Sequence, residues 1–418
     1  MPGTFRSLKT PNYRLWAMGA IVSNVGTWMQ RTAQDWIVLT ELSDNNATAV
    51  GIVMGLQFGP HILLLPVTGF VADHVDRRKL LFVTQALMGL LALGLGVLTI
   101  AKVIELWHVY VFAFLLGCVT AFDAPARQTF VGELVEDAHL TNAVALNSSS
   151  FNTARMIGPS MAGLLIGLIG SGWVFVINAA SYLAVLTSLA LLQASQLYRR
   201  PRAVRAQSRF ADGFRYVWNR PDLMTILIML FLIGTFGINF QIFISTMSVT
   251  VFHAGAQEFG LLTSMMACGS VIGALLTARS ERSRMEFFAL GALMFGAALL
   301  LAAAMPRFWL FGLALVLVGC AAQRFTTASN TAMQLWSDAA VRGRVMAIFL
   351  AITLGGTPLG APLVGRVADV FGPRMAMGVG AASGFAAAAV ALYYLVKYRR
   401  LRVRIVDGQL RMLSDPPA

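Results

Sequence analysis

The sequence predicts an all-α polytopic membrane protein with twelve transmembrane helices arranged as two six-helix pseudo-repeats. Three observations lead to this prediction: an apolar composition, a skewed distribution of basic residues and an internal repeat. Of 418 residues, 57% are hydrophobic and 12% are charged, whereas a water-soluble domain carries roughly a quarter charged residues. Repeated apolar stretches of about 20 residues each meet the length that a helix needs to cross a bilayer.

The predicted spans follow one another through short polar turns, apart from one longer polar segment in the middle of the chain. Each span is expected to be helical because the bilayer core offers no hydrogen-bond partners to an extended backbone. Their boundaries lie near residues 15–40, 49–72, 80–101, 107–126, 141–169, 172–195, 223–251, 257–278, 287–304, 308–328, 344–368 and 373–396.

The basic residues test this count. With the N-terminus placed in the cytoplasm, 24 of the 32 Lys and Arg residues fall in the termini and even-numbered turns, and three fall in the opposite turns. The other five lie in or at the ends of spans. An excess of basic residues marks the cytoplasmic side, so both termini are expected there. The net charge of +13 does not favour nucleic-acid binding, because the arginines are spread over alternate turns.

The long polar segment divides the chain into four predicted regions: an N-terminal half (1–195), a cytoplasmic linker (196–222), a C-terminal half (223–396) and a basic tail (397–418). Within the linker, Phe210, Phe214 and Val217 recur near helical spacing. This spacing predicts an amphipathic helix on the inner membrane surface, and a solvated linker with a partly helical middle fits equally well.

The two halves share a sequence pattern. The stretch Glu133-Leu134-Val135-Glu136-Asp137-Ala138 precedes the fifth span, and Gln334-Leu335-Trp336-Ser337-Asp338-Ala339 precedes the eleventh. Two six-helix halves with internal symmetry are typical of alternating-access transporters, in which the substrate binds between the halves near the midplane.

A charged turn joins the second and third spans. It reads Gly69-Phe70-Val71-Ala72-Asp73-His74-Val75-Asp76-Arg77-Arg78-Lys79 and resembles the G-x-x-x-D-x-x-G-R-R-K loop of the major facilitator superfamily, with Asp76 in place of the second glycine. The resemblance implies that Gly69, Asp73, Arg77 and Arg78 take part in conformational switching. An ordinary basic hairpin of another membrane protein is the alternative.

Three further stretches extend this resemblance to the subgroup that holds enterobactin exporters and macrolide efflux proteins. They are Gly26-Thr27-Trp28-Met29-Gln30-Arg31, Ala121-Phe122-Asp123-Ala124-Pro125-Ala126-Arg127-Gln128 and Asn142-Ala143-Val144-Ala145-Leu146-Asn147. Asp123 and Arg127 lie four residues apart and share a helix face. We expect them to latch onto the Asp73 turn in one access state, with a static surface pair as the alternative.

The fifth predicted span contains Arg155-Met156-Ile157-Gly158-Pro159-Ser160-Met161-Ala162-Gly163. It resembles the second half of the G-P-x-x-G-G antiporter motif, through Gly158, Pro159 and Gly163. The resemblance implies a proton-linked exporter. A helix that is kinked by proline and packs closely on a neighbour is the alternative.

Charged residues inside spans are costly and usually face a cavity or a partner. Arg31 and Asp35 lie four residues apart in the first span, where they can neutralise one another, and Arg155 is a second candidate partner. Asp35 becomes a proton site if its counter-ion comes and goes, whereas an Asp35 wetted at the outer membrane edge would be inert. His61 can titrate in the useful range or be structural.

Further polar residues can line a cavity or hold helices together. They are Asn24, Gln30, Gln34, Asn178, Asn239 and Gln241. We expect a non-enzymatic secondary exporter in a bacterial inner membrane that exchanges protons for a bulky hydrophobic or amphipathic solute, with an uptake symporter as the alternative. Its expected partners are that small molecule, protons and the lipid bilayer, with no nucleic acid, cofactor or metal, and the chain is expected to be a monomer. No phosphate-binding G-x-x-x-x-G-K-[ST] motif is present, which excludes ATP as the driver.

Overall fold

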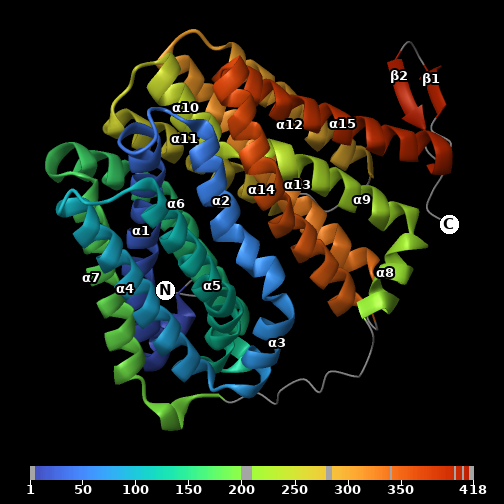
Figure 1. Cartoon of the computed structure of the whole chain (residues 1–418). Helices are drawn as coiled ribbons and strands as arrows, with labels where there is room; N and C mark the ends of the chain where they lie inside the picture. Colours follow the sequence, from blue (N-terminus) through green and yellow to red (C-terminus); the bar gives the residue numbers. More distant parts are fainter. Residues whose placement is uncertain are drawn as a thin grey trace. The chain divides into compact units, whose positions relative to one another are not determined.

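A computed structural model of the chain describes residues 5–198, 210–278, 285–338, 341–399, 402–406 and 409–413 (Figure 1). The chain falls into two compact units. Unit 1 comprises Met1–Val204 and Ile244–Ala267, and unit 2 comprises Arg205–Phe243 and Cys268–Ala418. Within the described ranges, nine helical segments are long and apolar enough to cross a membrane, which confirms a multi-pass membrane protein. They are Arg77–Ile100, Leu106–Glu133, Ser171–Leu191, Pro221–Val251, Ala256–Thr277, Met285–Ala304, Phe308–Trp336, Arg342–Phe371 and Pro373–Tyr398.

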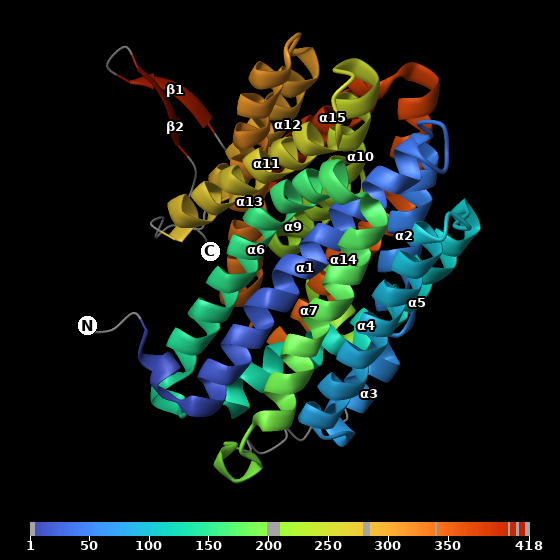
Figure 2. The same ribbon diagram turned by 90° about the vertical axis from the view of Figure 1, so that its left-hand side faces the viewer.

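Unit 1 is built from seven helices and the segment that follows residue 243. The helices are α1 (Pro11–Thr40), α2 (Ala47–Leu63), α3 (Leu65–His74), α4 (Arg77–Ile100), α5 (Leu106–Phe130), α6 (Asp137–Ile169) and α7 (Ser171–Leu191). Short 3-10 helices add η1 (Arg6–Lys9), η2 (Val131–Glu133) and η3 (Ala194–Gln196). Both ribbon views place α1 beside α6 and α7, on which it packs (Figures 1 and 2).

The local sequence explains where several of these helices begin and end. Asp76, which replaces a glycine of the resembled loop, caps α4 by accepting a hydrogen bond from the Lys79 backbone N–H at 3.0 Å. The predicted span 49–72 is two helices rather than one, because the chain breaks at Leu64 between Pro60 and Pro66. Gly69 and Asp73 belong to α3, and the surroundings of Gly69 and of the Asp73 side chain lie outside the described part of the structure.

Large apolar side chains fill the core of unit 1 at the end where α1 begins. Trp16 of α1 meets Phe130 of α5 edge to face, with ring centroids 5.4 Å apart, and Leu189 of α7 belongs to the same fully buried cluster. Gly26 lets α1 approach α7 closely, since a side chain there would collide with Asn178 and Ser181. This close packing holds the polar residues of α1 against those of its neighbours.

The helices of unit 2 are α8 (Phe210–Trp218), α9 (Pro221–Leu232), α12 (Met285–Ala304), α13 (Phe308–Trp336), α14 (Arg342–Phe371) and α15 (Pro373–Arg399). Two more, α10 (Phe240–Thr246) and α11 (Ala256–Ala278), contain the division between the units. The predicted span 223–251 is helical but interrupted, because π-helical turns η4 (Ile233–Gly237) and η5 (Met247–Val251) replace regular helix. Within unit 2, α12 packs closely along α15.

The linker and the tail differ in how well they were predicted. The amphipathic pattern around Phe214 forms α8, in which Val217 is buried while Phe214 and Trp218 are exposed beside one another. The apolar part of the chain is helical as predicted, and the tail differs in holding strands that the prediction did not name. They form an antiparallel pair, β1 (Arg402–Val406) and β2 (Gln409–Leu413), in which the register pairs residue 404 with residue 411. The alternation of arginine with β-branched residues in Arg-Val-Arg-Ile-Val is the sequence signal for this strand.

Candidate functional site

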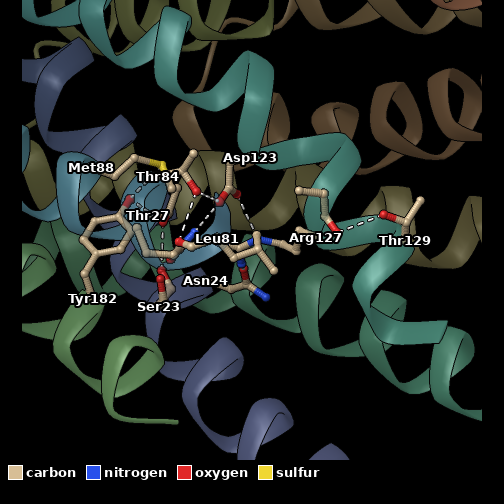
Figure 3. A network of polar contacts seen from close by, with 12 residues as sticks. Ser23, Asn24, Thr27, Leu81, Thr84, Met88, Asp123, Arg127, Thr129 and Tyr182 are labelled. Atoms are coloured by element: carbon tan, nitrogen blue, oxygen red, sulfur yellow. Dashed lines mark hydrogen bonds and ion pairs between the residues drawn. The ribbon is translucent and has the colours of Figure 1, made fainter. Parts of the chain in front are cut away.

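The carboxylate of Asp123 on α5 is the centre of a buried polar network in unit 1 (Figure 3). One of its oxygens, Oδ1, accepts hydrogen bonds from Thr84 Oγ1 and Gln85 Nε2 of α4, both at 2.7 Å. The other, Oδ2, pairs with Arg127 Nε at 3.1 Å. Asp123 is 5% exposed, and a buried carboxylate is tolerated only when its lone pairs are satisfied in this way.

Arg127 extends this network from α5 to α1. Its Nη1 donates to Asn24 Oδ1 at 3.2 Å, and its guanidinium carbon lies 5.9 Å from the Trp16 ring centroid. Nearby, the hydroxyls of Thr27 and Tyr182 lie 3.3 Å apart and link α1 to α7. Four helices, α1, α4, α5 and α7, are therefore joined by polar contacts (Figure 3). The described partners of Asp123 lie on α4 and α5, and its predicted contact with the Asp73 turn stays a prediction because the Asp73 side chain lies outside the described part of the structure.

The basic turn before α4 contacts two other parts of unit 1. Arg77 forms an ion pair with Glu133 of η2. Arg78 donates from Nε to the carbonyl of Leu189 at 2.8 Å and from Nη2 to that of Ala190 at 3.1 Å. These carbonyls belong to the last turn of α7, where the helix supplies them with no donors. Sequence reasoning missed Glu133 as the partner of Arg77, although an acidic residue just after the fourth span was visible.

Two polar contacts outside the spans each raise the pKa of one of their partners. Tyr198 donates to Glu136 Oε1 at 3.0 Å, and this bond to a carboxylate raises the pKa of the Tyr198 hydroxyl. In unit 2, Arg220 makes a two-pronged pair with Asp222, at 3.0 Å and 2.6 Å, which raises the pKa of the Arg220 guanidinium. The first contact joins the segment after η3 to the residue that precedes α6, and the second lies where α9 begins.

A second polar cluster surrounds Trp28 on α1. The guanidinium carbon of Arg31 lies 5.0 Å from the Trp28 ring centroid, and that of Arg155, on α6, lies 5.7 Å from it. Asp35 is buried one turn further along α1. Among the described residues, Arg31 and Asp35 share no hydrogen bond or ion pair, and Arg155 contacts the indole rather than Asp35. Arg31 and Asp35 therefore attract one another through their charges without direct contact, and their mutual neutralisation stays a prediction.

The direction of side chains along a helix explains this outcome. Side chains lean toward the helix N-terminus, so a long side chain reaches a residue three or four positions earlier. Arg127 reaches back to Asp123, whereas Arg31 reaches back to Trp28 and away from Asp35. The order of the acidic and basic residues thus decides which pair forms, as it does in isolated helices.

The residues of the antiporter-like motif bring α6 against its neighbours. A Cβ on Gly158 would lie 2.6 Å from the Cβ of Trp28, so only glycine permits this approach of α6 to α1. Gly163 and Pro159 lie against the start of α11 in the same unit, where Ser160 Oγ and Ser264 Oγ are 2.7 Å apart. The motif thereby places Arg155 at the Trp28 ring.

The remaining candidate residues are distributed between the two units. In unit 1, Gln30 and Asn178 hydrogen-bond to one another across α1 and α7, and Gln34 is buried. His61 of α2 is half-buried and its Nδ1 has no partner within the described residues. In unit 2, Asn239 donates to the carbonyl of Thr235 at 2.8 Å, and Gln241 is half-buried.

No group of three His, Cys, Asp or Glu side chains in the described ranges is arranged to hold a metal ion. The long apolar helices of the described ranges define a multi-pass membrane protein. The chain belongs to the transmembrane secretion effector family of the major facilitator superfamily, whose profile matches residues 3–408.

Relatives of known name support this assignment along nearly the whole chain. The staphyloferrin A transporter of Staphylococcus aureus is 25% identical over 92% of this chain and 96% of its own length. The enterobactin exporter EntS of Citrobacter koseri is 24% identical over 91% and 88%. The multidrug efflux pump Tap of Mycolicibacterium fortuitum is 25% identical over 84% and 88%.

Solved structures show the same fold. A bacterial homologue of the human lysosomal transporter Spinster superposes with a TM-score of 0.74 over 92% of this chain and 96% of that one, at 16% identity. The nucleoside transporter NupG gives a TM-score of 0.71 over 93% and 100%, at 14% identity. At such identities the likeness concerns the fold alone.

Proposed function

We propose that the chain is a secondary exporter that exchanges protons for a bulky amphipathic solute by alternating access. The observation that carries the proposal is Asp35, a buried carboxylate in α1 that lies outside ion-pair distance of every basic group in the described structure. An intramembrane carboxylate without a fixed counter-ion can take up and release a proton as the charges around it change. Relatives named as siderophore and multidrug exporters support the outward direction.

The proposed architecture is twelve spans in two six-helix halves, 1–195 and 223–396. Besides the nine segments above, α1 and α6 are 30 and 33 residues long, and α2 and α3 join through Leu64 alone. Counting the α2–α3 pair as one span brings the total to twelve. The Asp123 network and the Arg77–Glu133 pair are the proposed switch, which would hold in one access state and open in the other.

A pH-gradient assay tests the coupling. A panel of siderophores, macrolides and dyes is first screened for reduced accumulation in a pump-deficient host. The exported compound is then followed in vesicles with and without a pH gradient. Asp35→Asn is expected to abolish gradient-driven export while still letting the compound equilibrate down its own gradient. Gradient-driven export by the variant at the wild-type rate would assign coupling to another group. Uphill uptake driven by protons would favour the symporter alternative.

We further propose that both termini and the turn at Asp76 face the cytoplasm of a bacterial inner membrane. The support is the positive-inside distribution of basic residues. In Asp76→Cys on a cysteine-free background, a membrane-impermeant maleimide is expected to label the protein in inverted vesicles and not in intact cells. Labelling of intact cells alone would reverse the topology.

A further inference from the structure

The Trp28 cluster contains hydrogen-bond donors that the protein leaves without acceptors. Within the described structure, neither Arg31 nor Arg155 makes a hydrogen bond or an ion pair, and both side chains are half-buried. The indole Nε1 of Trp28 is also buried with no acceptor among the described residues. A guanidinium carries five N–H donors and an indole one, so acceptors are what this cluster lacks.

The charge of the cluster is also unbalanced. Two guanidinium groups lie on one indole ring, at 5.0 Å and 5.7 Å from its centroid, and repel one another. The ring quadrupole attracts each cation and offsets only part of that repulsion. Asp35 contributes a single negative charge that contacts neither arginine. A net positive charge therefore remains inside a helix pair that spans the membrane, where unpaired charges are costly.

Rigid packing holds the two arginines together despite this cost. Gly158 brings the backbone of α6 against Trp28, three residues after Arg155 on the same helix. Phe151, one turn before Arg155, meets the Trp28 ring edge to face at 5.7 Å and is 46% exposed. The donors therefore lie next to an accessible aromatic wall.

We propose that Arg31, Arg155 and the Trp28 indole N–H bind the oxyanion group of the transported amphipath, and that the wall formed by Trp28 and Phe151 contacts its apolar part. A carboxylate or phosphate supplies several acceptor oxygens and a negative charge, which are the two things that the cluster lacks. This inference rests on the proposed function, which leaves open the charge of the solute. It assigns an anionic amphipath as the substrate class.

Binding of matched probes to the full chain tests this assignment without any ion gradient. The protein is placed in phosphatidylcholine nanodiscs and dialysed to equilibrium against 2-naphthoate, 2-naphthamide or 2-naphthylmethylammonium, with binding to empty discs subtracted. The three probes share one ring system and differ in head-group charge. We expect the wild type to bind the carboxylate at least about tenfold more tightly than the amide, since hydrogen bonds to a charged group are the stronger kind.

Substitutions then identify the donors. Arg155→Gln and Arg31→Gln are each expected to weaken 2-naphthoate binding by roughly tenfold while 2-naphthamide binding stays within about twofold. Arg155→Lys should recover part of the loss, because it restores the charge without the planar fork. The matched control is Arg324→Gln in unit 2, which removes a half-buried arginine of α13 and should leave both affinities unchanged. Retained amide binding shows that the variants are folded.

Three results would overturn the assignment. One is equal wild-type affinity for the carboxylate and the amide, and another is an equal loss of both in the arginine variants. The third is loss of carboxylate selectivity when phosphatidylglycerol is added to the discs, since a lipid head group would then be the occupant. Failure of pH-driven export in vesicles with intact carboxylate selectivity would instead count against the proposed function alone.

Discussion

Two polar clusters of unit 1 each contain an aspartate and an arginine four residues apart. In one cluster these two residues form an ion pair, and in the other they do not. At Asp123 the acidic residue comes first and Arg127 follows four residues later, and the two form an ion pair that α4 and α1 complete. At Arg31 the basic residue comes first, Asp35 follows four residues later, and the two make no direct contact in the described structure. Because helix side chains lean toward the N-terminus, the first order closes a pair and the second separates it.

The comparison distinguishes two proposed roles, a contact that holds one access state and a cluster that responds to a ligand or a proton. The Asp123 network has partners for its charge on three helices, so it stabilises one arrangement of α1, α4 and α5. The Trp28 cluster keeps donors and charge in excess, so a ligand or a proton can change its energy strongly. Polar groups of the second kind are those that a transporter can couple to a solute.

The largest expected effect comes from removing Asp123. Asp123→Ala leaves the Arg127 guanidinium without its carboxylate and the Gln85 amide without its acceptor. We expect a loss of about 3–5 kcal/mol in the free energy of unfolding, as for other broken buried pairs. Denaturant unfolding in detergent, followed by tryptophan fluorescence, measures it. Asp35→Ala is the control and should change stability by less than about 1 kcal/mol, since Asp35 makes no hydrogen bond or ion pair within the described structure. Similar losses in both variants would erase the contrast between the clusters.

A smaller effect is expected from Gly158, which sets the distance between α6 and the Trp28 ring. Gly158→Ala places a methyl group 2.6 Å from the Trp28 Cβ, and the overpacking should cost about 1–3 kcal/mol. Gly167→Ala is a matched control on the same helix, because a Cβ there meets nothing within 4 Å. It should be neutral or stabilise by about 0.5–1 kcal/mol. The same unfolding assay decides, and equal effects of the two substitutions would show that the close approach does not matter for stability.

The smallest expected effect tests the residue order directly. Exchanging the two residues, as Arg31→Asp with Asp35→Arg, creates the order found at Asp123 and Arg127. The new pair should raise the free energy of unfolding by roughly 0.3–0.5 kcal/mol, the usual contribution of a well-oriented helical pair. Each single substitution serves as a corner of a double-mutant cycle that isolates the coupling energy. A coupling energy as large in the original order as in the exchanged one would contradict the argument from side-chain direction.

Much of the membrane architecture was accessible from the sequence. The apolar stretches predicted the helices because a bilayer accepts a backbone only when its hydrogen bonds are made within the segment. The predicted spans near 80–101, 107–126 and 308–328 lie within α4, α5 and α13, apart from one residue at the end of the first. The break at Leu64 was missed because its prolines are surrounded by apolar residues, and hydropathy does not register a lost backbone donor. The strands of the tail were not predicted, because basic charge alone does not distinguish a strand from an irregular end.

For the two polar clusters, the sequence predicted which charged residues matter but not which partners they contact. Arg31, Asp35, Arg155, Asp123 and Arg127 were all singled out because charges inside apolar stretches are rare and costly. Their partners were assigned by spacing, and spacing alone does not distinguish the two orders of an acidic and a basic residue. Thr84, Gln85 and Trp28 were missed as site residues, since a threonine, a glutamine or a tryptophan in a span has no distinctive sequence signal.

By itself the sequence determined that this chain crosses a membrane many times, where most of its apolar helices lie and which charged residues lie among them. These properties depend on the transfer of each segment from water to hydrocarbon, which is set by local composition. Only the tertiary structure decided that Asp123 bonds to Thr84, that Arg77 pairs with Glu133 and that Arg155 shares the Trp28 ring with Arg31. Each of these contacts joins residues whose distance depends on how closely two helices approach, as Gly158 shows for α1 and α6. That approach is a property of packing between helices, which no single segment encodes.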